Sequence, residues 1–290
     1  MSADILDPAW LRRHPLPVPP EDTDKNSRGR VVLVGGSLRV PGGLTLTATA
    51  ALRAGAGKVQ IGLPEPLAIP TGLAMPEAAV IALPSGKDGE IADASPLLSD
   101  IKPQTCLALG PAVTSPDAAG VILDALLPAA SEMPVILDAA AVNAAAGRRE
   151  AVASLPGGAV LTPHVGEMAQ LTGLEADDIE SRREDVVRQA ARDFNAVTIL
   201  KGPTTLIASP DGETLLYGGG GAGLATGGSG DVLTGIVAAL CARGMPAWEA
   251  VCWGVWLHGE AGRRLAERLG PMGYLARELP AELPSLMRGV

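Results

Sequence analysis

The glycine-rich turn from Thr226 to Asp231 contains the residue types in this sequence that are best suited to phosphate chemistry. Its three glycines let the backbone adopt conformations that a side chain forbids, and they let backbone N–H groups approach a ligand closely. The apolar, alanine- and leucine-rich stretch from Val232 to Ala242 predicts a buried helix that begins near Asp231. A helix start presents unpaired N–H groups and the positive end of the helix dipole, so the turn predicts a phosphate site.

The carboxylate of Asp231 would repel an anion at rest in such a site, so its presence suggests a catalytic role. As a general base, Asp231 would remove a hydroxyl proton while the N–H groups of Gly228, Ser229 and Gly230 stabilise a phosphoryl group in transfer. The alternative is that Asp231 only caps the helix, as aspartate often does. The local sequence leaves both interpretations open, because short glycine motifs often occur by chance.

The elements that would position this turn form an alternating series of strands and helices. Strands that are apolar throughout and alternate with helices are typical of a parallel sheet with helices on both faces. We therefore predict an α/β fold with a central, mostly parallel sheet and an antiparallel hairpin at its edge. The expected strands are 30–36, 58–63, 79–83, 105–109, 134–137, 158–162 and 197–200, the hairpin joins 205–208 to 213–217, and the expected helices are 44–54, 117–127, one ending at 146, 167–171, 177–194 and 246–268.

Glycines and residues with functional side chains stand at the ends of several predicted strands. In a parallel α/β sheet the ligand lies beyond the carboxyl ends of the strands, where such residues meet. We therefore expect one ligand site along this edge of the sheet. The residues concerned are Gly35, Gly36, Gly110, Asp138, His164 and Lys201.

The composition restricts the class of protein. A formal net charge of −9 argues against a nucleic-acid-binding surface, which needs a basic face. The three cysteines lie in apolar surroundings without a CxxC pair, which predicts buried thiols in a reducing compartment. With no signal sequence and no unbroken apolar run, we expect a cytoplasmic protein without membrane contact. We also expect one domain over residues 1–290, with residues 1–29 as a proline-rich N-terminal arm packed on the surface.

Several segments, in order, resemble the ADP/ATP-dependent NAD(P)H-hydrate dehydratase family of the ribokinase-like superfamily. The resemblance extends from about residue 24 to residue 270, nearly the whole chain. It implies a ribokinase-like fold for the predicted sheet. The matching segments are Gly35-Gly36-Ser37 with Pro41-Gly42, Thr162-Pro163-His164 with Gly166-Glu167, Lys201-Gly202 with Thr205, Thr226 to Asp231, and Leu257-His258-Gly259.

The resemblance implies a repair enzyme that restores NADH or NADPH after hydration of the nicotinamide ring. Family members use ADP or ATP as co-substrate and Mg²⁺ as cofactor, and they phosphorylate the ring hydroxyl so that it can leave. Asp231 would deprotonate that hydroxyl, and Mg²⁺ would be held mainly by phosphate and water. The resemblance also implies a homo-oligomer, a tetramer, and a functional pairing with a separate NAD(P)H-hydrate epimerase.

The resemblance assigns the remaining site residues. For Lys201 the alternative is a strand-end surface lysine, and for His164 it is a loop histidine that caps the following helix. Nucleotide contacts fall on Lys201, Gly202, Pro203, Thr204, Thr205 and Gly230, and contacts with the hydrated dinucleotide fall on Gly43, Gly110, His164 and Asp231.

The chain departs from the family's pattern at several positions. The family's Pro-Gly-Ala appears as Pro41-Gly42-Gly43, and its Gly-Pro-Gly appears as Gly110-Pro111-Ala112. A usual second aspartate is Ala140, a common asparagine is Gly221, and an early His-Lys-Gly is Asp24-Lys25-Asn26.

Two other functions remain open on the sequence. A kinase for a small alcohol or vitamin precursor would use the same aspartate and anion site, although the segments from Thr162 and from Lys201 favour the dehydratase. A non-catalytic nucleotide-binding sensor would explain Ala140 and Gly221, although the intact Gly228 to Asp231 segment argues against it.

Overall fold

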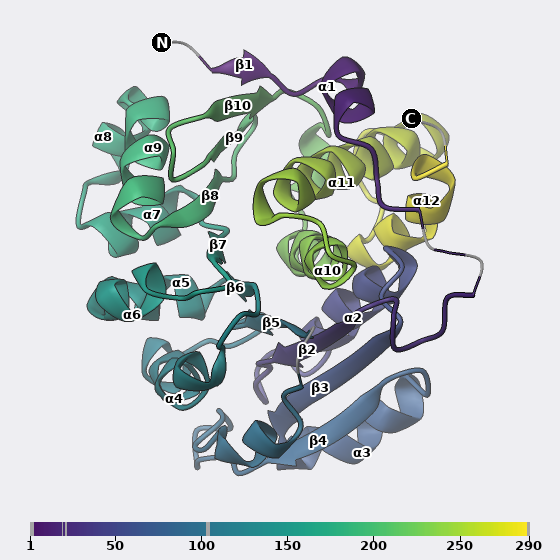
Figure 1. Cartoon of the computed structure of the whole chain (residues 1–290), viewed down its shortest axis with the longest axis vertical. Helices are drawn as coiled ribbons and strands as arrows, with labels where there is room; N and C mark the ends of the chain where they lie inside the picture. The colour runs from purple at the N-terminus through teal and green to yellow at the C-terminus, as the bar shows by residue number, and fades with distance from the viewer. Residues whose placement is uncertain (1–2, 19, 21, 103–104, 289–290) are drawn as a thin grey trace.

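The computed structural model describes residues 3–18, 20, 22–102 and 105–288. Figure 1 shows a central sheet that runs diagonally through the molecule, with helices on both sides. The strands among these residues are β1 (Asp4–Ile5), β2 (Arg30–Val34), β3 (Lys58–Pro64), β4 (Ala79–Leu83), β5 (Thr105–Leu109), β6 (Val135–Leu137), β7 (Ala159–Leu161), β8 (Ala196–Leu200), β9 (Thr205–Ala208) and β10 (Thr214–Tyr217).

The ten strands form one sheet in the order β1-β10-β9-β8-β7-β6-β5-β2-β3-β4. Neighbouring strands are parallel, except that β9 is antiparallel to both β8 and β10. The predicted hairpin is thus β9–β10, and the mostly parallel α/β architecture is confirmed.

Helices cover both faces of the sheet (Figure 1). One face carries α2 (Gly43–Arg53), α10 (Ser229–Ala242), α11 (Ala247–Leu269) and α12 (Leu279–Leu286). The other face carries α4 (Pro116–Leu126), α5 (Ala140–Ala145), α6 (Arg149–Ala153), α7 (Val165–Thr172), α8 (Ala176–Ser181) and α9 (Arg183–Asp193).

The strands contribute alternate residues to two hydrophobic cores, one on each face. In β2, Val31 and Leu33 belong to the core that includes residues of α2, α10 and α11, whereas Val32 and Val34 belong to the core on the opposite face. All four side chains are fully buried. This explains why the strand is apolar at every position rather than at every second one.

The N-terminal arm is more ordered than the sequence suggested. It forms β1, which pairs in parallel with β10, and α1 (Pro8–Arg13). Leu6 and Leu11 are buried in the core, and the indole of Trp253 in α11 donates a hydrogen bond to the carbonyl of His14 at 2.7 Å. Residues 1–2, 19 and 21 of the arm lie outside the described residues.

Two helix predictions need correction, and the short helices α1, α6 and α12 were also not expected. The single helix expected over 177–194 is divided into α8 and α9, because Arg182 leaves the helical conformation with φ −135° and ψ 39°. The helix α3 (Glu65–Ala74), which lies against β3 and β4, was not predicted. Its prolines mask the helical pattern: one occupies the first turn, where its missing N–H is harmless, and Pro70 lies inside.

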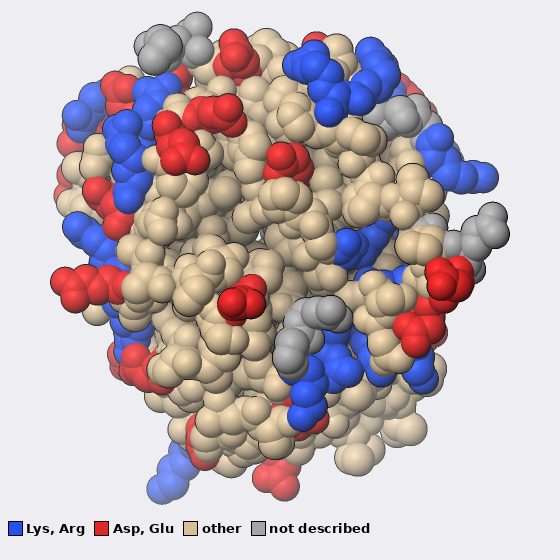
Figure 2. Space-filling model, in the orientation of Figure 1, with Lys and Arg blue, Asp and Glu red and all other residues tan. Residues whose placement is uncertain are grey.

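The cysteines are buried, as expected from their apolar surroundings, and the described residues on the surface visible in Figure 2 form no extended basic face. Cys106, Cys241 and Cys252 are buried free thiols. On the face shown in Figure 2, charged residues of both signs lie around the outline while the centre is mainly uncharged. Within the described ranges, no helix has the length and apolar character needed to cross a membrane.

Candidate active site

A cavity of about 970 Å³ lies beyond the carboxyl ends of β6, β7 and β8. Asp138, His164 and Lys201, which follow these three strands, line it together with the start of α10 and part of α11. This brings together most of the residues that the sequence analysis selected. The lining comprises Ala112, Asp138, Ala139, His164, Glu167, Lys201, Gly202, Pro203, Thr205, Tyr217, Gly219, Gly221, Ala222, Leu224, Ala225, Thr226, Ser229, Gly230, Asp231, Leu233, Val255, His258 and Gly259.

The glycine turn leads into α10 through a left-handed residue. Gly228 is the N-cap, with φ +88°, and a Cβ on it would lie 2.4 Å from Cδ1 of Leu46. A larger residue would therefore be both strained and blocked. Among the described residues, the N–H groups of Gly228 and Gly230 make no backbone hydrogen bond, whereas the N–H of Ser229 donates to the carbonyl of Thr226 at 3.2 Å. The helix start thus offers free donors, but the Ser229 N–H is already used.

Asp231 is the third residue of α10, because the helix begins at Ser229, two residues earlier than expected. The N-cap of α10 is Gly228, so Asp231 is not the N-cap that the alternative interpretation proposed. Burial and the nearby carboxylate of Asp138 raise the pKa of Asp231 to about 7, against the opposing effect of Lys201. A carboxyl group with this pKa exchanges its proton near neutral pH, as a general base must.

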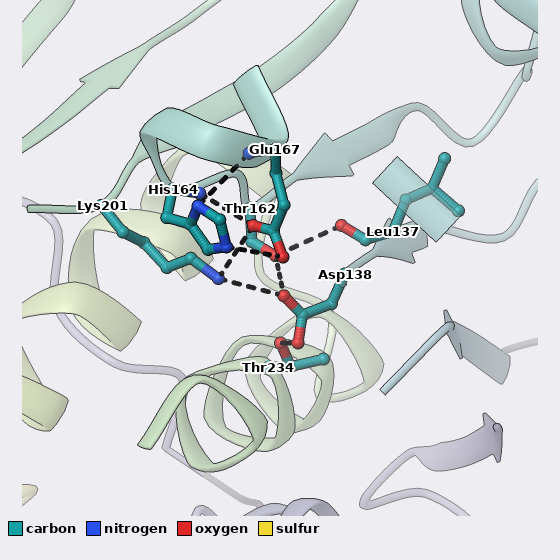
Figure 3. Close-up of polar contacts among 7 residues, drawn as sticks. All are labelled: Leu137, Asp138, Thr162, His164, Glu167, Lys201 and Thr234. Carbon is teal, nitrogen blue, oxygen red and sulfur yellow. Dashed lines mark hydrogen bonds and ion pairs between the residues drawn. The ribbon is translucent and has the colours of Figure 1, made fainter. Parts of the chain in front are cut away.

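The side chain of Lys201 lies between two carboxylates (Figure 3). Its Nζ is 3.2 Å from Oδ1 of Asp138 and 3.6 Å from Oε2 of Glu167. Only 22% of the side chain is exposed, so the alternative of an ordinary surface lysine is wrong. Burial alone would lower the pKa of Lys201, but Asp138 and Glu167 raise it, so the ammonium group stays charged.

Asp138 is the buried anchor of this arrangement, with 3% of its surface exposed. Its carboxylate accepts hydrogen bonds from the hydroxyl groups of Thr162 at 2.6 Å and Thr234 at 2.9 Å, as well as from Lys201. Burial alone would raise the pKa of Asp138, but Lys201 and the two threonines lower it, so it is ionised. Because Thr234 lies in α10, Asp138 ties the helix that carries Asp231 to the strand end that carries Lys201.

His164 caps α7, as the alternative interpretation proposed. Its Nδ1 accepts the backbone N–H of Glu167 at 3.2 Å, and Oε2 of Glu167 accepts the backbone N–H of His164 at 2.8 Å. The side chain is nevertheless 58% exposed and borders the cavity. Capping and ligand contact are therefore compatible. Glu167, which the site prediction omitted, joins His164 to Lys201, and its place in the Gly166-Glu167 segment was the available signal.

The segment from Lys201 to Thr205 is held by Arg183, the first residue of α9. One guanidinium nitrogen of Arg183 donates to the carbonyl groups of Thr204 at 3.0 Å and Leu200 at 3.4 Å. A Cβ at Gly202 would lie 2.7 Å from this nitrogen, so glycine leaves room for the contact. The sequence carried no signal for Arg183, since arginines of amphipathic helices are usually solvated.

Four predicted site residues do not line the cavity: Gly43, Gly110, Thr204 and Gly228. At two of these positions, close packing requires glycine. Gly110 has φ +103°, and a Cβ there would lie 2.2 Å from the carbonyl oxygen of Asp138. At Gly43, a Cβ would lie 2.3 Å from the Cβ of Ala112, which itself lines the cavity. Both glycines lie directly behind the wall of the site.

The family model for NAD(P)H-hydrate dehydratase matches residues 31–285. The chain belongs to this family. It is 41% identical to the ADP-dependent (S)-NAD(P)H-hydrate dehydratase of Xanthomonas campestris over 96% of this chain and 94% of the relative. It is 38% identical to the bifunctional NAD(P)H-hydrate repair enzyme Nnr of Moorella thermoacetica, matching 99% of this chain and about half, 54%, of that longer protein.

Solved structures of the family have the same fold. The ADP/ATP-dependent NAD(P)H-hydrate dehydratase of Bacillus subtilis, co-crystallised with ATP and Mg²⁺, superposes with a TM-score of 0.83. The alignment includes 99% of each chain at 29% sequence identity. Family membership and fold therefore rest on nearly the full length described.

Proposed function

We propose that this protein is an NAD(P)H-hydrate dehydratase that uses ADP or ATP to return hydrated NADH or NADPH to the reduced cofactor. The proposal is carried by the family match over residues 31–285, and its general base is Asp231, whose pKa is raised to about 7 at the start of α10. It shares the cavity with the ammonium group of Lys201 and the free N–H of Gly230. The relatives from Xanthomonas campestris and Bacillus subtilis bear the name of this reaction.

In this mechanism the terminal phosphoryl group of the nucleotide moves to the hydroxyl oxygen of the hydrated ring. Asp231 accepts the hydroxyl proton as the new P–O bond forms, and AMP leaves when the donor is ADP. The free N–H of Gly230, which lines the cavity, stabilises the negative charge on the phosphoryl oxygens. The N–H of Gly228, which also makes no backbone hydrogen bond, would add to this if the bound phosphoryl group reaches the N-cap. Phosphate, a better leaving group than hydroxide, then departs with the electrons of the C–O bond, and the adjacent ring carbon loses a proton.

The side chains around the cavity make no cage for a metal ion. Within the part of the chain that the structure describes, no group of three or more His, Cys, Asp or Glu side chains is arranged to hold one. The carboxylate of Asp138 is already occupied by two threonines and Lys201. We therefore propose that magnesium enters with the nucleotide, held mainly by phosphate oxygens and water.

The remaining assignments follow from the composition and from the family resemblance. We propose that residues 1–290 form one domain of a cytoplasmic homo-oligomer, a tetramer, that works with a separate epimerase. The Moorella thermoacetica relative is bifunctional, which supports such a pairing. In the proposed site Lys201, Gly202, Pro203, Thr204, Thr205 and Gly230 bind the nucleotide, and Gly43, Gly110, His164 and Asp231 border the hydrated dinucleotide.

One assay tests the proposal against its alternatives. The protein is incubated with hydrated NADH, Mg²⁺ and either ADP or ATP, and the reduced-nicotinamide absorbance is followed. We expect it to return only when a nucleotide is present. Binding of ADP without turnover would favour the sensor. Phosphorylation of a small alcohol without recovery of NADH would favour the kinase.

A further inference from the structure

The buried imidazole of His258 contacts the start of α10 directly. His258 lies in α11, and its Nε2 is 2.9 Å from Oγ of Ser229, the first residue of α10. Both residues are buried, and both line the cavity beside Gly230 and Asp231. The mechanism above gives neither side chain a role.

The imidazole is neutral at physiological pH. Burial lowers the pKa of His258 to about 4, and the charge of Lys201 acts in the same direction, while Ser229 opposes them. A neutral imidazole has one N–H donor and one acceptor nitrogen, and a serine hydroxyl can donate one hydrogen bond while it accepts another. The direction of the His258–Ser229 hydrogen bond therefore decides where the serine proton points.

We propose that His258 is a positioning residue that donates its Nε2–H to Oγ of Ser229, which directs the Ser229 hydroxyl proton to an oxygen of the transferring phosphoryl group. The inference rests on the proposed phosphoryl transfer. Because the Ser229 N–H is taken by the Thr226 carbonyl, the hydroxyl is the donor that Ser229 has left to offer. It stands next to the free N–H of Gly230, so the two would act on the same anion.

Variants of the pair separate positioning from packing. Ser229→Ala removes the donor and should lower kcat by roughly 10²-fold, with little change in nucleotide affinity, because the contact matters most in the transition state. His258→Leu, which keeps an apolar side chain of moderate size, should lower kcat by at least ~10-fold. The double variant should be no slower than Ser229→Ala alone, since both changes remove one interaction. His258→Gln places an amide N–H near the lost donor and should restore most of kcat.

The matched control is Cys252→Ala, which truncates a fully buried side chain of the same helix outside the cavity. It should lower the melting temperature and leave kcat unchanged. If His258→Leu behaves like this control, or if the losses at Ser229 and His258 multiply, the positioning role is wrong.

A spectroscopic experiment needs no turnover. The chain has three histidines, so ¹⁵N-histidine labelling resolves the tautomer of His258 in the complex of aluminium fluoride with AMP or ADP, the nucleotides that leave when ADP or ATP is the phosphoryl donor. We expect the Nε2–H tautomer and weaker binding of this complex to Ser229→Ala and His258→Leu. The Nδ1–H tautomer would overturn the inference. Wild-type protein that shows the expected tautomer but does not turn over hydrated NADH would refute the proposed function alone.

Discussion

Gly43 and Ala112 face each other so closely that the space between them holds only one methyl group. A Cβ on Gly43 would lie 2.3 Å from the Cβ of Ala112, far inside van der Waals contact. Ala112 has φ +59°, in the left-handed region that favours glycine. The family pattern has alanine at the first position and glycine at the second. The departures at Gly43 and Ala112 are therefore one exchange. The methyl group that the family pattern has at position 43 stands at position 112 in this chain.

This exchange predicts strong coupling between the two positions. Gly43→Ala alone should destabilise the protein by about 1–3 kcal/mol through overpacking. Ala112→Gly should relieve about 1 kcal/mol of left-handed strain, partly offset by the flexibility of glycine in the unfolded chain. The double variant should regain the loss caused by Gly43→Ala. Urea denaturation measures all three, with Gly147→Ala, where a Cβ meets open space, as the control. Additive free energies would refute the exchange.

Lys201 is predicted to have two separable roles. Lys201→Ala should weaken ADP and ATP binding by ~1.5–3 kcal/mol, the range of a charge-assisted contact. It should also destabilise the fold by about 3–5 kcal/mol, because the buried carboxylate of Asp138 loses its cation. The double variant Lys201→Ala with Asp138→Asn should recover stability without recovering nucleotide affinity. Isothermal titration and thermal unfolding measure the two effects, and unchanged affinity in a folded variant would remove Lys201 from the nucleotide site.

His164 allows capping and ligand binding to be tested separately. His164→Ala should lose about 0.5–2 kcal/mol of stability with the cap and should also weaken the affinity for hydrated NADH. Asparagine is a good N-cap, so His164→Asn should keep the stability and still show the weaker substrate affinity. Nucleotide affinity should change in neither variant. If nucleotide affinity falls and substrate affinity holds, His164 belongs to the other half of the cavity.

The sheet was predictable because its strands are apolar at every position and are separated by glycine, proline and helical segments. The same logic placed Asp138, His164 and Lys201 at one edge, since parallel strands end on the same side. Helix α3 was missed because proline normally ends a helix, yet here Pro70 is tolerated inside one.

The side-chain contacts of the site were beyond such reasoning. Asp138 and Thr234 are 96 residues apart and meet only because α10 packs against the strand ends. The choice between a surface lysine and a paired one at Lys201 depends on the distant Asp138 and on Glu167, whose carboxylate also completes the cap of α7. Periodicity and motif spacing describe local structure. They carry no information on which carboxylates and hydroxyl groups, distant in sequence, surround the same charged side chain.

The proposed role of Asp231 as general base predicts a specific pH dependence. The base acts when it is deprotonated, and the pKa of Asp231 in the folded protein is about 7. The kcat/KM for hydrated NADH should therefore rise with pH through about 7 and level off above it. Asp231→Asn should lose ~10²–10⁴ in rate, the usual cost of removing a positioned base. ADP affinity should hold or rise slightly in this variant, because a negative charge near the phosphates is gone.

The stability of the same variant gives a second, independent test. The pKa of Asp231 is raised from 3.8 to about 7 on folding, so the unfolded chain loses this proton first as pH rises. Asp231 therefore costs little stability below about pH 4, and its cost grows until pH reaches about 7. Asp231→Asn carries no such cost, so its stability relative to wild type should increase between about pH 4 and about pH 8. Urea denaturation at both pH values measures the difference. Near-normal turnover of the variant would show that Asp231 is not the base. If its stability relative to wild type also stays constant between the two pH values, the pKa of Asp231 is not raised by folding.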